Sequence, residues 1–130
     1  KVIASTSMIE YITQNADLLE TIGIFFPFIL AAILKSAQGS STVALTTTAG
    51  IVAPILPVLG LDSPIRATLA VMAIGAGAMT VSHANDSYFW VVTNFGAMTP
   101  EKGYKTQTMA TLVLGISGMV EIFVLSLFLH

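Results

Sequence analysis

Two short polar stretches carry most of the side chains in this sequence that could do chemistry, and both interrupt apolar segments. The stretch SHANDS at 82–87 places a histidine, an asparagine and an aspartate close together, and the stretch KSAQGSST at 35–42 places a lysine ahead of small hydroxyl residues. Polar and charged side chains inside apolar segments are costly unless they are paired or line a site. We therefore take the two stretches as candidate solute-binding and ion-coupling segments.

The stretch at 35–42 could hold an anion. If a helix begins near Ser41, its first backbone N–H groups are unpaired and favour negative charge. Lys35 adds a positive charge, and the hydroxyl groups can donate or accept hydrogen bonds. We predict that a carboxylate with several hydroxyls binds to this stretch. The predicted ligands are Lys35, Gln38, Gly39, Ser40, Ser41 and Thr42. In the alternative interpretation, Ser and Thr only cap the helices, Gln38 fills a turn and Lys35 reaches the membrane surface.

The stretch at 82–87 could break a helix. A broken helix exposes backbone groups that bind ions or substrate. Asp86 and His83 beside a cavity could relay protons, so we predict them as the proton-coupling residues and Asn85 and Ser87 as substrate ligands. In the alternative, Asp86 caps the second half-helix and His83 binds backbone. One histidine and one aspartate do not fill a metal ligand set, so no metal site or other cofactor is predicted.

The composition indicates an all-α membrane protein. The chain is 55% hydrophobic and only 9% charged, whereas soluble domains carry about 25% charged residues. The net charge of −2 gives no basic patch for nucleic acid, and there are no cysteines. No nucleophile–base constellation is present, so an enzyme is not expected. Because a few spans rarely make a complete transporter, we interpret the chain, residues 1–130, as a segment of a longer membrane protein.

Two short apolar arms predict a re-entrant helical hairpin at 22–58. The run at 22–34 is shorter than the roughly 20 residues that cross a bilayer, and threonines dilute the second arm at 42–59. A polar tip at membrane depth is tolerated only when it is buried in protein or faces water. The alternative is two ordinary, short spans joined by a polar turn.

The remaining elements follow from caps and apolar length. Ser63 and Pro64 suit the start of a helix, and the apolar run from there is interrupted by SHANDS, so we predict one broken transmembrane helix at 64–98. A polar loop at 99–105 then precedes the last transmembrane helix, at 106–129. Residues 1–20 have the pattern of an amphipathic interfacial helix.

Charge indicates the orientation in the membrane. Lys102 and Lys105 lie together in the polar stretch before the last span. The positive-inside rule places this stretch in the cytoplasm. The predicted hairpin would then enter from the opposite side.

Two motifs together resemble a known family. AQGSSTVALTTTAGIVAP at 37–54 and SHANDSYFWVV at 82–92 resemble the gluconate permease (GntP) family of bacterial inner-membrane proton symporters, in order and spacing as well as in sequence. The resemblance covers 35–130 well and implies the C-terminal part of a multi-pass permease several times this length. It also implies the wider ion transporter superfamily, built from two inverted repeats, each with a re-entrant hairpin and a broken helix, which move as an elevator against a scaffold.

The predicted function is therefore secondary active import of gluconate or a related sugar acid with protons across the inner membrane. The expected partners are a gluconate-like carboxylate, protons, membrane lipid and the rest of the same permease chain, with a homo-oligomer as a further option. Two alternatives remain at this point. One is a sodium-coupled organic-anion carrier, and the other is a non-transporting scaffold subunit whose polar residues serve helix association.

Overall fold

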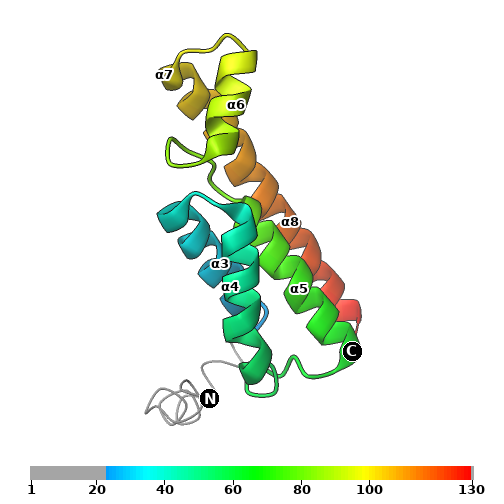
Figure 1. Ribbon diagram of the computed structural model, residues 1–130. Coiled ribbons are helices and arrows are strands. Elements are labelled where there is room, and N and C mark those ends of the chain that lie inside the picture. Colours follow the sequence, from blue (N-terminus) through cyan, green and yellow to red (C-terminus); the bar gives the residue numbers. More distant parts are fainter. Residues whose placement is uncertain (1–22, 130) are drawn as a thin grey trace.

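The structure, a computed structural model, describes residues 23–129, and this part of the chain is helical with no strands (Figure 1). The predicted interfacial helix at 1–20 lies outside the described residues. In chain order the elements are α3 (Phe25–Gln38), α4 (Ser41–Val52), the short 3₁₀ helix η2 (Ala53–Ile55), α5 (Pro64–Met79), α6 (Ser87–Phe95), α7 (Pro100–Gly103), the π-helical turn η3 (Tyr104–Thr108) and α8 (Met109–Phe128).

Helices α3 and α4 form a hairpin whose tip is Gly39–Ser40. Gly39 adopts a left-handed φ of 74° and its N–H binds the carbonyl of Lys35, which ends α3. Ser40 then caps α4 by accepting a hydrogen bond from the N–H of Val43 at 3.3 Å. The two helices have 14 and 12 residues, or about 21 and 18 Å, whereas a bilayer core is about 30 Å thick. Neither arm is long enough to cross a bilayer by itself.

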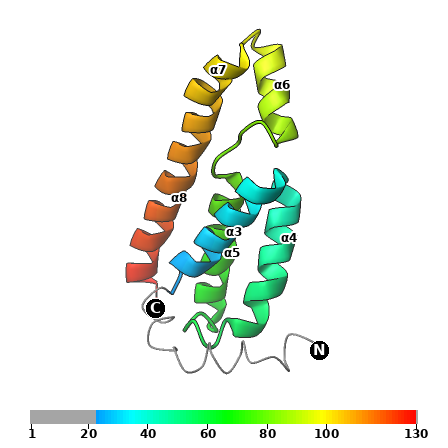
Figure 2. The ribbon, with the colours of Figure 1, turned by 90° about the vertical axis from the view of Figure 1, so that its left-hand side faces the viewer.

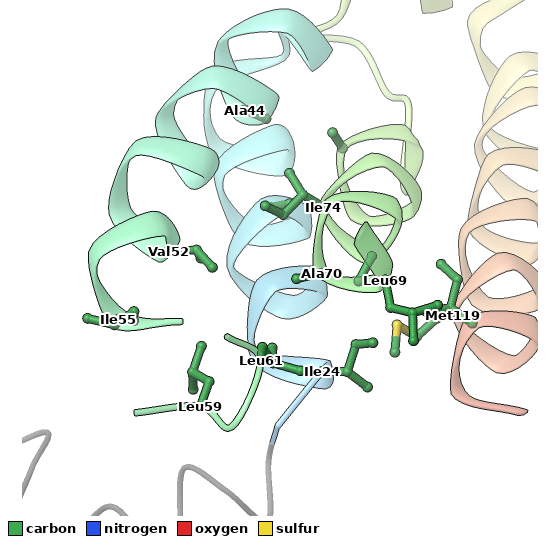
Figure 3. Close-up of a cluster of buried hydrophobic side chains, with 14 residues drawn as sticks. Ile24, Ala44, Val52, Ile55, Leu59, Leu61, Leu69, Ala70, Ile74 and Met119 are labelled. Carbon is green, nitrogen blue, oxygen red and sulfur yellow. The ribbon is translucent and has the colours of Figure 1, made fainter. Parts of the chain in front are cut away.

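Helix α5 is the centre of the bundle and packs against α3, α4 and α8. It starts as the sequence predicts, with Ser63 as N-cap and Pro64 in the first turn. Its small residues let α3 approach closely, because a Cβ on Gly77 would overlap the backbone carbonyl of Phe28. The buried aliphatic core lies around α5, as Figure 3 shows. Its members include Ala44, Val52, Leu69, Ala70, Ile74 and Met119.

A polar segment at 80–86 separates α5 from α6. Thr80 has an extended backbone that ends α5, and Val81 has a left-handed φ of 57° that turns the chain. Asp86 is the N-cap of α6 and accepts from the N–H of Tyr88. The predicted break at SHANDS is thus a connection between two helices, and α6 lies beyond the end of α5 (Figure 1).

The last helix starts earlier than predicted. The prediction of a polar loop at 99–105 is wrong, because Thr99 caps a helix whose first residue is Pro100. A threonine followed by a proline and a glutamate is a helix-start signal that outweighs the polarity of the stretch. Through α7, η3 and α8 the helix runs over Pro100–Phe128, and it is the one helix of the described residues long and apolar enough to cross a membrane. It extends alongside both α5 and α6 (Figure 2).

Candidate functional site

The hairpin tip contacts the break between α5 and α6. A Cβ on Gly39 would overlap the backbone carbonyl of Asn85, so only glycine permits this approach. The side chain of Asn85 donates to the carbonyl of Ser36 at 2.7 Å, and Nε2 of His83 lies 3.1 Å from the same oxygen. Two stretches that are far apart in the sequence therefore form one polar region.

A buried ion pair joins the two stretches. Nζ of Lys35 lies 2.6 Å from Oδ2 of Asp86, and the two residues are 2% and 5% exposed. The ammonium also donates to the carbonyl of Gly39 at 3.1 Å. Asp86 accepts from the hydroxyl of Ser82 at 2.7 Å and from the N–H of Tyr88 at 3.0 Å. The carboxylate is thus both the cap of α6 and the partner of the lysine, and the capping alternative fits the geometry as well.

Neighbouring side chains satisfy the backbone groups that the break leaves open. Thr111 of α8 accepts from the N–H of Ser82 at 2.9 Å, and Thr108 donates to the carbonyl of Ser82 at 2.7 Å. The indole of Trp90 donates to the carbonyl of Ala84 at 2.8 Å. In an apolar environment an open backbone needs such partners, so α8 is part of what keeps the break in shape.

A cavity of about 360 Å³ lies beside the ion pair and is bounded by the hairpin tip, the break and the final helix. This volume is in the range of small-molecule sites. Its polar lining comes from all three elements. These residues are Lys35, Ser41, Ser82, Asp86, Gln107 and Thr111, and Tyr88 of α6 lines the cavity as well. The site therefore combines a cation, a carboxylate, hydroxyls and an amide, which is chemistry suited to an anion with hydroxyl groups.

The structure divides the predicted residues into three groups. Lys35, Ser41 and Asp86 line the cavity. Gly39, Asn85 and His83 hold the tip against the break, and Ser40 caps α4. The others are exposed and do not line the cavity. They are Gln38, Thr42 and Ser87. The alternative in which Lys35 reaches the membrane surface is wrong, because the side chain is buried.

The final helix also contributes to the cavity, which was not predicted from the sequence. Gln107 and Thr111 line the cavity, and they are four residues apart, so they share one helix face. Two polar residues at this spacing near the start of an apolar span were the signal that could have identified them.

Comparison with known proteins gives a consistent result. A family model described as GntP family permease matches residues 1–128. The chain is 38% identical to a gluconate permease of Pseudomonas aeruginosa over 94% of its length, covering 26% of that protein. It is 37% identical to the Gnt-II system L-idonate transporter of Escherichia coli over 78% of its length, covering 22% of that protein.

Another similar protein is the inner membrane permease YgbN of Escherichia coli. The two are 40% identical over 72% of this chain, which covers 20% of that protein. The chain therefore spans between a fifth and about a quarter of the length of these relatives. No solved structure matches it.

Proposed function

The chain belongs to the GntP family of permeases, which are transport proteins rather than enzymes, and we propose that it forms the C-terminal segment of a permease that imports gluconate or a related sugar acid together with protons. Relatives named for gluconate and for L-idonate support a sugar acid as the substrate. A relative named as an inner membrane permease supports the inner membrane as its location.

The observation that carries the proposal is the buried Lys35–Asp86 pair in the wall of the cavity. The pair is neutral as it stands. A substrate carboxylate that enters and binds the Lys35 ammonium would leave the site with one negative charge in excess. Such a charge is costly away from water. A proton on Asp86 restores neutrality and releases the lysine for the substrate, so one carboxylate would travel with at least one proton.

Two other titratable residues lie close to this pair: Tyr88, which lines the cavity and whose backbone N–H binds Asp86, and His83. The histidine is half-buried, it binds the Ser36 carbonyl, and it does not line the cavity. We assign it to positioning the break and keep Asp86 as the proton carrier. Ser41, at the start of α4, would place its hydroxyl and the free backbone N–H groups of that helix at the substrate carboxylate.

The arrangement of helices supports a re-entrant hairpin. Both arms are short, and the tip of the hairpin ends against the break. The tip and the break lie at the level of the middle of the final helix (Figure 2). Transporters bind solutes near the bilayer midplane at such interrupted helices. In this proposal the rest of the same permease chain supplies the inverted counterpart of the hairpin and the broken helix.

Uptake by the whole permease in proteoliposomes tests the proposal. An imposed inward proton gradient should drive accumulation of gluconate at a fixed sodium concentration. Asp86→Asn should abolish this accumulation while it retains exchange of labelled gluconate down its own gradient, because asparagine still caps α6 but carries no proton.

Three outcomes would contradict the proposal. Proton-driven accumulation that survives in Asp86→Asn removes Asp86 as the carrier. Uptake that depends on sodium at fixed pH indicates a sodium-coupled carrier. Absence of any uptake by correctly folded permease indicates a scaffold role.

A further inference from the structure

Gln107 is a half-buried residue whose side-chain nitrogen is buried and has no hydrogen-bond partner. Among the described residues, its side-chain nitrogen Nε2 is one of two buried side-chain polar atoms without a hydrogen bond, and the other is the hydroxyl oxygen of Thr48. A buried donor without a partner is costly, because it has lost its hydrogen bonds to water and gained none in return. The two sites differ in one respect, because Gln107 lines the cavity beside the ion pair whereas Thr48 is fully buried in α4 and does not line it.

The backbone around Gln107 is also unusual. The residue lies in η3, a π-helical turn inserted between α7 and α8. Such turns are rare and occur frequently at functional sites. Downstream of the turn, Thr111 binds the N–H of Ser82 in the break, so the face of the helix that carries Gln107 is fixed against the cavity.

The part of the cavity wall that the final helix contributes has no charge. The groups suited to a carboxylate, Lys35 and Ser41, come from the hairpin, and the final helix contributes an amide and a threonine hydroxyl. The threonine is already engaged in holding Ser82. The free N–H of Gln107 is therefore the available donor on that wall. A solute with its carboxylate at the hairpin would direct its other end toward this donor.

We propose that Gln107 is a substrate-binding residue that donates a hydrogen bond to a hydroxyl of the sugar-acid chain. The inference rests on the proposed function, because it takes the solute to be a polyhydroxy acid whose carboxylate lies at Lys35. It assigns to the final helix the recognition of hydroxyl groups, and thereby discrimination between hydroxylated and deoxygenated acids.

Binding of gluconate and of its monodeoxy analogues to the purified whole permease tests the inference. Loss of one neutral hydrogen bond weakens binding by a few-fold to about tenfold. Gln107→Met, which keeps the length of the side chain, should weaken gluconate binding by this factor. It should also leave the binding of one particular deoxy analogue unchanged, because that analogue lacks the hydroxyl that Gln107 contacts.

Two further variants keep the test decisive. Thr48→Val removes the other unpartnered buried group and should leave the affinities for all these acids unchanged. Gln107→Asn keeps the amide on a shorter side chain and should show a smaller loss for gluconate than Gln107→Met. If Gln107→Met does not fold, Gln107→Asn alone should still lower the discrimination between gluconate and that one analogue.

An equal loss for gluconate and for every deoxy analogue would overturn the inference and indicate a structural role for Gln107. Unchanged binding of all acids would also overturn it. If wild-type permease binds none of these acids, the proposed function itself fails, and the inference fails with it. The first two results leave the proposed function intact, so the two failures are distinguishable.

Discussion

Lys35 and Asp86 show that the contribution of a charged residue to stability depends on its partner and on its burial. The described residues contain one other ion pair, between Lys105 and Glu101, whose side chains are 73% and 79% exposed. An exposed pair of this kind contributes little to stability. A buried pair also need not stabilise the protein, but removing one partner leaves an uncompensated charge. We therefore expect replacement of the lysine to destabilise the protein at the buried pair and to have little effect at the exposed pair.

We expect Lys35→Met to destabilise the permease by about 3–5 kcal/mol, because Asp86 loses its counter-charge in a buried site. The double variant Lys35→Met/Asp86→Asn should recover most of that loss, since no buried charge remains, yet it should not transport. Lys105→Met is the matched control and should change neither stability nor uptake. The free energy of unfolding in detergent and gluconate uptake check these outcomes. Full stability of Lys35→Met alone would show that Asp86 is not held as the charged partner.

Among the helices and their connections, the hairpin and the break hold each other in position. Gly39 ends α3 in the left-handed region and also lets the tip approach the backbone of Asn85. Gly50 lies within α4, and a Cβ there would meet no atom within 4 Å. Glycine is thus required at the tip for two reasons, whereas in the arm it only lowers helix propensity.

Gly39→Ala should destabilise the permease by more than about 1 kcal/mol and lower gluconate uptake, because the residue is strained and its Cβ pushes the tip away from the break. Gly50→Ala should be neutral or stabilising by up to about 1 kcal/mol, with normal uptake. Thermal unfolding and uptake assays compare the two. Equal behaviour of the two variants would contradict the contact between the tip and the break.

The whole described molecule combines one long helix with several short ones. Only 17% of the most apolar window of Pro100–Phe128 is buried, whereas the core helix of a soluble protein is mostly buried. Its exposed apolar face suits lipid or further membrane helices. The hairpin base and the connection into α5 lie toward one end of this helix, and α7, which contains Lys102, forms its other end (Figures 1 and 2).

Single cysteines should report this arrangement in cysteine-free permease, and this chain itself contains no cysteine. Asp62→Cys should react with an impermeant maleimide from the periplasmic side and Lys102→Cys from the cytoplasmic side. Gln38→Cys, at the tip, should react with a small charged thiol reagent but not with the bulky maleimide. If Gln38→Cys reacts with the maleimide as fast as Lys102→Cys does, the two arms are ordinary spans.

Local signals in the sequence were sufficient for several features of the fold. The helix start at Ser63–Pro64, the cap at Asp86 and the interruption at SHANDS each depend on a few adjacent residues, so they are visible without a structure. The helix start at Thr99–Pro100 carries an equally local signal, and the prediction of a loop there is wrong because the charged residues that follow are part of the helix.

The sequence by itself determined the membrane character, the two polar stretches and the family to which the chain belongs, because composition, caps and motifs are properties of neighbouring residues. Only the tertiary structure decided that Lys35 pairs with Asp86, that Gln38, Thr42 and Ser87 do not line the cavity, and that Gln107 does. These facts depend on how the hairpin, the break and the final helix pack together. Such packing is decided by contacts between distant parts of the chain, which local periodicity does not encode.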